Sequence, residues 1–189
     1  AQWQPAGDRI RTQWGEKLDP QNVLPEYPRP QMVRGDWQNL NGLWDYAVED
    51  GDGQTRRSTG KILVPFAPES LLSGCGFQLR SGETLRYERT FTLPQGFRRV
   101  TGQEAGRHEG GYLPFCLDVT ELLNDGENRL TAVVTDDAAG GVYGMGKQRY
   151  QRGGIWYTAT SGIWQTVWLE SVPGNYVKNI RLTPDLDAG

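Results

Sequence analysis

Aromatic and hydroxyl side chains gather in one stretch toward the end of the chain. Trp156, Tyr157 and Thr158 follow one another and precede a turn at Ser161-Gly162. A sugar ring offers an apolar C–H face that stacks on aromatic rings, and hydroxyl groups that hydrogen-bond to polar side chains. The stretch therefore predicts a sugar-binding loop. For Trp156 and Tyr157 the alternative is packing inside the protein.

Two adjacent carboxylates are expected to lie close to this loop. Asp136 and Asp137 end a predicted strand, and a glycine-rich loop then leads toward Trp156. Ionised carboxylates accept hydrogen bonds from hydroxyl groups, so both are candidate sugar-binding residues. Two other interpretations stay open, namely a calcium or sodium ion held together with backbone carbonyls, and a cap at the strand end.

A third carboxylate, Glu69, lies in a proline-flanked loop at residues 65–70. A side chain in such a loop commonly accepts hydrogen bonds from nearby backbone N–H groups, and we favour this structural role over a catalytic one. Glu69 nevertheless completes the candidate sugar-binding set. Its members are Trp156, Tyr157, Thr158, Asp136, Asp137 and Glu69.

Sequence motifs for other kinds of chemistry are absent. The chain has no Gly-x-Ser-x-Gly motif, and its one histidine, His108, lies in a glycine-flanked loop. The two cysteines, Cys75 and Cys116, are not spaced as zinc ligands. No catalytic residue, resident metal ion or cofactor is predicted. The cysteines form either one disulfide or two buried thiols, and we favour the thiols.

The elements that must position these residues are expected to be β-strands. The chain has 25 glycines, 11 prolines and 37% hydrophobic residues, which together with frequent turn signals favours an all-β domain. Alternating or β-branched runs predict strands at residues 40–49, 61–64, 85–93, 129–135, 163–169 and 176–183. A further short strand is expected at residues 116–120, after a loop. Trp164 and Trp168 lie on one face of the strand predicted at residues 163–169, and we expect both in the core.

Three segments make up the predicted domain organisation. Residues 1–36 are rich in proline and are expected to lie extended on the body of the domain. The β-sandwich is expected to cover residues 37–183, and residues 184–189 are interpreted as a linker. The first residue, Ala1, is compatible with signal-peptide cleavage, so we expect a periplasmic or secreted location, with a cytoplasmic one as the alternative.

The charge and hydropathy of the chain argue against two classes of partner. The net charge is −3, which gives no electrostatic attraction for nucleic acid or an anionic membrane. No apolar run approaches the ~20 residues that span a bilayer. We therefore expect neither nucleic acid nor a membrane as a partner.

Five segments together resemble the N-terminal sugar-binding domain of glycoside hydrolase family 2, which includes β-galactosidases and β-glucuronidases. They occur in the family's order and are Tyr27–Arg34, Leu40–Tyr46, Val64–Ser70, Gly106–Tyr112 and Ile155–Glu170. The resemblance implies a jelly-roll β-sandwich and a carbohydrate partner of the β-galactoside or β-glucuronide type. In that family the two catalytic glutamates lie in a (β/α)8 barrel after the sandwich domains, and this chain lacks the alternating strand and helix pattern of a barrel. The resemblance therefore implies a non-catalytic, carbohydrate-binding accessory domain.

The chain departs from the family pattern in two places. Some members have a sugar-contacting aspartate just before the Ser-Gly-Ile turn, where this chain has Trp156, and stacking by Trp156 is the replacement that we expect. After Val100 the family pattern continues with two strands and their turn, whereas this chain continues directly at Thr101. A missing hairpin would expose sheet edges, which predicts either pairing with a second copy of the chain or a local rearrangement.

Two further functions stay open. The chain could be a glycoside hydrolase in its own right, with acid–base work done by Glu69, Glu109, Asp136 or Asp137. A cleft holding two carboxyl groups about 5 to 9 Å apart would favour that function. The chain could also be a structural domain that positions other domains or subunits, which a flat apolar surface would favour. A shallow groove with one exposed tryptophan would favour carbohydrate binding.

Overall fold

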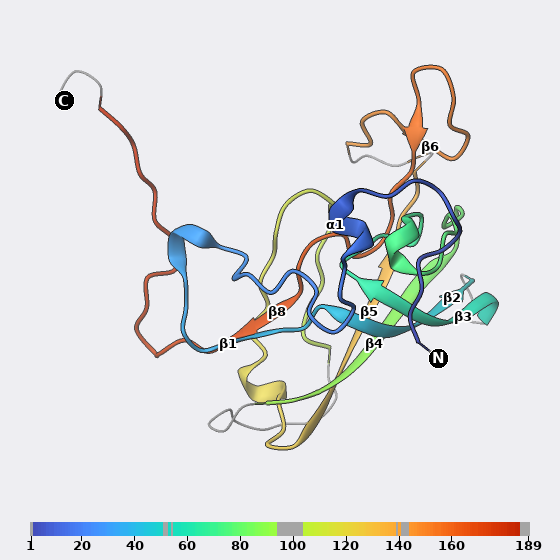
Figure 1. Ribbon diagram of the computed structural model, residues 1–189. Helices are drawn as coiled ribbons and strands as arrows, with labels where there is room; N and C mark the ends of the chain where they lie inside the picture. Colours follow the sequence, from blue (N-terminus) through green and yellow to red (C-terminus); the bar gives the residue numbers. More distant parts are fainter. Residues whose placement is uncertain are drawn as a thin grey trace.

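A four-stranded antiparallel sheet forms the centre of the computed structural model, with its strands in the order β3-β2-β4-β5 (Figure 1). The bounds of these strands are Gly42–Glu49 for β2, Thr55–Val64 for β3, Thr84–Thr92 for β4 and Glu127–Thr135 for β5. The structure describes residues 2–50, 53, 55–93, 104–138, 140 and 144–185. The strands predicted at residues 40–49, 61–64, 85–93 and 129–135 are therefore confirmed, with shifted ends, whereas the short strand predicted at residues 116–120 is wrong, because residues 116–119 are irregular and a 3₁₀ turn begins at Thr120.

Two short ladders and a few helical turns complete the secondary structure of the described residues. β1 (Trp37–Asn39) pairs antiparallel with β8 (Trp168–Glu170), and β6 (Gln148–Arg149) pairs parallel with β7 (Tyr157–Thr158). The helical turns are α1 (Gln13–Glu16) and the 3₁₀ turns Pro30–Met32, Leu71–Ser73 and Thr120–Leu122. The predicted all-β fold class is confirmed. None of these helices is long and apolar enough to cross a membrane.

One face of the four-stranded sheet carries the core. Trp44 of β2 and Tyr87 of β4 are buried there, and their rings meet edge to face with 6.3 Å between centroids. The buried cluster consists of Leu40, Trp44, Val48, Ile62, Val64, Leu79, Leu85 and Tyr87. Ile163, Val167 and Leu169 pack against this cluster, so the C-terminal segment forms the second layer of the sandwich.

The strand predicted at residues 163–169 is wrong over most of its length. β8 begins only at Trp168, and residues 163–167 are irregular. The N–H of Ile163 donates to the Tyr87 hydroxyl at 3.2 Å, and the N–H of Val167 donates to the Asn41 side-chain oxygen at 3.0 Å. These side chains satisfy backbone groups that a neighbouring strand would otherwise bind, so the segment packs without a regular ladder.

The expected burial of the two tryptophans in this segment is confirmed only in part. Trp168 is half-buried, and its indole N–H donates to Glu170. Trp164 is 45% exposed, and its indole N–H donates to the Gly111 carbonyl at 2.8 Å. The irregular backbone removes the alternation on which the core prediction for Trp164 rested.

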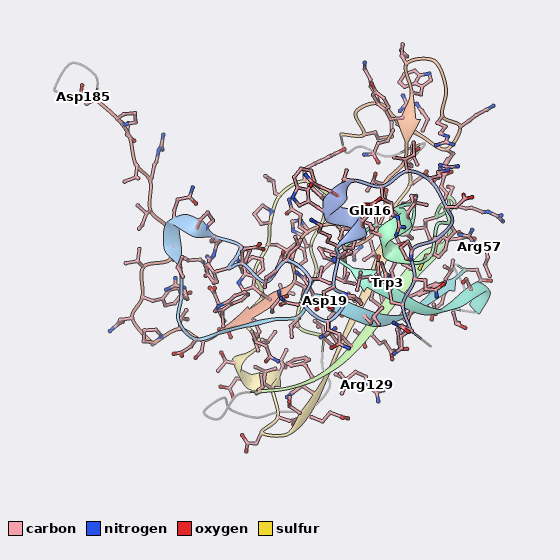
Figure 2. The ribbon with its side chains drawn as sticks, in the orientation of Figure 1. Trp3, Glu16, Asp19, Arg57, Arg129 and Asp185 are labelled. Atoms are coloured by element: carbon pink, nitrogen blue, oxygen red, sulfur yellow. The ribbon has the colours of Figure 1, made fainter. Side chains whose placement is uncertain are left out.

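The last predicted strand, at residues 176–183, is also wrong. This segment is irregular and exposed, and it leads away from the sheets to Asp185 (Figures 1 and 2). A strand needs a neighbour that binds its backbone, and the ladder between β1 and β8 ends at Glu170, before this segment begins. The predicted loss of a hairpin after Val100 falls on residues outside the described ranges.

The cysteines are two free thiols, as the sequence favoured. Cys75 is partly buried beside the core, whereas Cys116 is exposed, so the expected burial of Cys116 is wrong.

Candidate functional site

The sequence-predicted aromatic loop lies in a finger that projects from the body of the molecule, which we define as residues 144–160 (Figure 1). Its two arms pair through β6 and β7, with Gln148 opposite Tyr157 and Arg149 opposite Thr158. Gly153 and Trp156 exchange two backbone hydrogen bonds of 3.2 and 3.0 Å, which close the turn between the arms. The finger therefore has a defined conformation although its ladder is short.

Aromatic rings and cations meet on the surface of this finger. The guanidinium carbon of Arg149 lies 4.2 Å from the centroid of the Trp156 ring, and the Lys147 ammonium lies 5.9 Å from that of Tyr157. Trp156 is 39% exposed and Tyr157 66% exposed. An open depression is lined by Arg149, Tyr150, Gln151, Arg152, Gly153 and Trp156. Part of each ring thus remains available to a ligand.

The side chain of Gln148 connects the two arms of the finger and also contacts Tyr112, outside the finger. Its oxygen accepts the backbone N–H of Thr160 at 2.6 Å, and its amide nitrogen lies 3.2 Å from the Tyr112 hydroxyl. The sequence indicates no more than a polar residue at this position. Its partners lie 12 and 36 residues away, so no local pattern could have shown its role.

The predicted carboxylates gather at the base of the finger. Asp137 accepts hydrogen bonds from the hydroxyls of Tyr150 and Ser81, at 3.1 and 3.2 Å. Asp136 is half-buried, and this burial, together with the negative charges of Glu69 and Asp137, raises the pKa of its carboxyl. Tyr150 comes from the finger, so it links the acidic group to the aromatic one. Sequence analysis missed this tyrosine.

Glu69 binds backbone, as its structural interpretation predicts. One carboxylate oxygen accepts the N–H of Ser161 at 3.1 Å, and the other accepts the N–H of Leu79 at 3.4 Å. Two residues further on, Ile163 donates to the buried hydroxyl of Tyr87. The Ser-Gly-Ile turn is thereby anchored from both sides, and this anchor fixes where the finger leaves the core.

The structure thus divides the six predicted residues into two groups. Trp156, Tyr157 and Thr158 lie on the exposed finger, whereas Asp136, Asp137 and Glu69 lie at its base. Across the described ranges, no three His, Cys, Asp or Glu side chains converge as ligands of a metal ion would.

Comparison with known proteins places this site in a wider context. No family model matches the sequence. The chain is 25% identical over 210 residues to β-glucuronidase of Canis lupus familiaris, an alignment that covers 85% of this chain and 32% of that enzyme. It is 26% identical over 136 residues to β-glucuronidase of Paenibacillus borealis, covering 58% of this chain and 22% of the relative. A Formosa agariphila protein named for the same activity is 32% identical over 84 residues, covering 44% of this chain and 9% of that protein.

These relatives make the chain weakly similar to β-glucuronidases, which belong to glycoside hydrolase family 2. The chain spans at most about a third of the length of the relatives named above.

Proposed function

We propose that this chain is a carbohydrate-binding, non-catalytic part of a glycosidase of the β-glucuronidase type. The observation that carries the proposal is the finger, which presents the partly exposed rings of Trp156 and Tyr157 on an ordered support, in a chain similar to glycosidases. An exposed ring on a rigid support stacks on a sugar at little entropic cost. The sugar would be of the β-galactoside or β-glucuronide type.

The polar groups around the finger fit the rim of a sugar. Thr158 is exposed on the same arm as Tyr157, and the Asp137–Tyr150 pair at the base offers a carboxylate and a hydroxyl. Carboxylate and hydroxyl groups bind the hydroxyls of a sugar while the rings cover its apolar face. In the proposed site the aromatic rings therefore cover the apolar face of the sugar, and the carboxylate and hydroxyl groups bind its hydroxyls.

In this proposal the glycosidic bond is cleaved by residues outside this chain. Glycoside hydrolysis needs two carboxyl groups that face the bond, one of them as a proton donor. Both oxygens of Glu69 already accept backbone N–H groups, and Asp137 accepts two hydroxyls. These contacts support a structural or binding role for both residues.

One observation favours the second candidate function, a glycoside hydrolase in its own right. Asp136 lies beside two other carboxylates and its pKa is raised, and a carboxyl group in such surroundings can act as a general acid. Assay of the purified chain on nitrophenyl β-glycosides tests this candidate. Turnover that Asp136→Asn abolishes would establish the hydrolase and overturn the non-catalytic proposal.

The domain of this proposal is a shortened jelly-roll sandwich. The alignment with the canine enzyme spans 210 residues, which is more than the 189 residues of this chain. That enzyme therefore has positions without a counterpart here, which supports the proposed absence of a segment.

Substitution of Trp156 tests the binding function. Trp156→Ala should weaken binding of a β-galactoside or β-glucuronide about tenfold in calorimetry, since loss of one stacking ring costs on the order of 1 kcal/mol or more. Trp14→Ala is the matched control, because Trp14 is an exposed tryptophan on α1, outside the finger. Equal affinity of the Trp156 and Trp14 variants would overturn the proposed site. Absence of any saccharide binding by the natural chain would overturn the function and favour a purely structural domain.

A further inference from the structure

All the charged side chains of the finger have the same sign. They are Lys147, Arg149 and Arg152, and the sequence contains no aspartate or glutamate between Asp137 and Glu170. The chain as a whole has a net charge of −3, so the charge of the finger is opposite in sign to that of the chain. Such a local excess creates a positive potential at the finger.

Among the described residues, no salt bridge joins Lys147, Arg149 or Arg152 to a carboxylate. Arg57, in contrast, pairs with Glu83 at 2.9 Å. The finger therefore keeps its capacity to bind an anion.

The guanidinium of Arg149 is already oriented. It stacks on the ring of Trp156, and one of its terminal nitrogens donates to the Gln148 carbonyl at 2.6 Å. A guanidinium has five N–H donors, so most remain for a ligand. Because stacking and one hydrogen bond limit its rotation, little side-chain entropy is left to lose on binding. Arg152 lines the same depression and is exposed.

A second open depression adjoins the first and shares Tyr150 with it. Its lining residues are Arg57, Gln78, Leu79, Arg80, Ser81 and Tyr150. Arg80 is exposed and adds another cation, again without a carboxylate in a salt bridge among the described residues. Two adjoining hollows that both contain arginine suit a ligand longer than one sugar with more than one anionic group.

From these contacts we infer that the finger binds an acidic polysaccharide, through Arg149 and Arg152, by a carboxylate or sulfate group carried on the sugar. The inference rests on the proposed carbohydrate-binding function and adds the charge and length of the ligand. Arginine binds planar carboxylates and the oxygens of sulfate with paired N–H groups, and Trp156 stacks on the adjoining sugar face. Carboxylate and sulfate share this chemistry, so the test separates them.

Binding of the full 189-residue chain to three polymers tests the inference. Polygalacturonate carries only carboxylates, dextran sulfate only sulfates, and dextran is the neutral counterpart. We expect affinity for at least one polyanion that falls with added salt, and none of that strength for dextran. The Arg149→Gln/Arg152→Gln double variant should lose at least tenfold. Arg129→Gln removes one arginine charge from β5, far from the finger in Figure 2, and should keep the affinity of the natural chain. Circular dichroism confirms that each variant is folded.

Several results would overturn the inference. They are unchanged affinity in the folded double variant, an equal loss in Arg129→Gln, and tighter binding of single-stranded DNA than of either polyanion. A chain that binds a neutral β-galactoside but neither polyanion contradicts this inference and leaves the proposed function intact. A chain that binds no saccharide contradicts both.

Discussion

The hydroxyl oxygen of Tyr87 lies 2.1 Å from the position that a β-carbon on Gly162 would occupy. The backbone of Gly162 has φ +76°, a left-handed conformation that favours glycine. The same hydroxyl accepts the N–H of Ile163. Contact between this turn and the core therefore requires glycine at position 162. The N–H of Ile163 also gives the buried Tyr87 hydroxyl a hydrogen-bond partner.

Gly162→Ala should destabilise the protein by at least ~2 kcal/mol, because both the close contact and the left-handed backbone oppose a side chain. Tyr87→Phe should cost ~1–2 kcal/mol, since it leaves the N–H of Ile163 without its acceptor. Urea unfolding measures both effects.

The Gly162→Ala/Tyr87→Phe double variant distinguishes the close contact from the left-handed backbone as the cause of the loss. Without the hydroxyl, the nearest atoms to a β-carbon at residue 162 are a Leu85 methyl and the Tyr87 ring carbon, both at 3.2 Å. Gly162→Ala should therefore cost less in the Tyr87→Phe background than in the natural chain. Strict additivity of the two losses would show that the close contact has no energetic effect.

Glu170 joins the proline-rich N-terminal segment to β8. Its carboxylate accepts hydrogen bonds from the Tyr27 hydroxyl at 2.6 Å, from Arg29 and from the Trp168 indole at 3.2 Å. Partial burial opposes its charge, but these hydrogen bonds prevail and lower the pKa of Glu170 below 4.5. Because the unfolded chain binds the proton more readily, this stabilisation is present above pH 4.5 and is lost as the pH falls through the folded-state pKa.

Glu170→Gln should accordingly cost ~1 kcal/mol at pH 7, and this difference from the natural chain should shrink in acid. Urea unfolding at pH 7 and at pH 3 measures it. Glu16→Gln is the control, because Glu16 is an exposed glutamate on α1. A difference that stays constant with pH would contradict the role of the charge.

The pKa of Asp136 is shifted in the opposite direction from that of Glu170, so its effect on stability depends on pH in the opposite sense. Burial and the charges of Glu69 and Asp137 raise its pKa above 3.8, so its ionised form costs stability as the pH rises through the folded-state value. Asp136→Asn should therefore stabilise the protein at pH 7, by up to ~1 kcal/mol, and give no gain below pH 3.8. Denaturant titrations at the two pH values measure this.

Glu69→Gln separates charge from hydrogen bonding. It removes a negative charge near Asp136, so the pKa of Asp136, followed by NMR titration, should fall toward its ordinary value. It also replaces one oxygen that accepts a backbone N–H, at a cost of ~1–3 kcal/mol in stability. An unchanged pKa of Asp136 would show that burial and the charge of Asp137 raise it without a contribution from Glu69.

The two thiols should react at different rates. Cys116 is exposed, whereas burial raises the pKa of the Cys75 thiol and leaves less thiolate. A thiol-specific reagent should modify Cys116 in the native protein, and Cys75 only slowly until urea is added. Cys116→Ser, which should remove the fast phase, is the control. A disulfide found by mass spectrometry in the purified chain would contradict the two free thiols.

The sequence alone was sufficient for the all-β class and for the strands that form the central sheet. For Glu69 it indicated a carboxylate that accepts backbone N–H groups, but not that one of them belongs to Ser161, 92 residues away. Alternation over residues 44–48 and 85–91 shows which side chains share one face of a strand, because successive side chains point to opposite faces, and this depends only on neighbours in the chain. The glycine of the Ser-Gly-Ile turn was recognisable for the same reason, since a turn is a local conformation.

Tertiary structure decided the features that depend on partners far along the chain. Residues 163–167 are irregular because Tyr87 and Asn41, 76 and 126 residues away from the groups they bind, satisfy the backbone there. The stack of Arg149 on Trp156 follows from the pairing of β6 with β7. The local sequence indicates which backbone and side-chain groups need a hydrogen-bond partner. Only the folded chain brings the partner within hydrogen-bonding distance, because that depends on long-range packing.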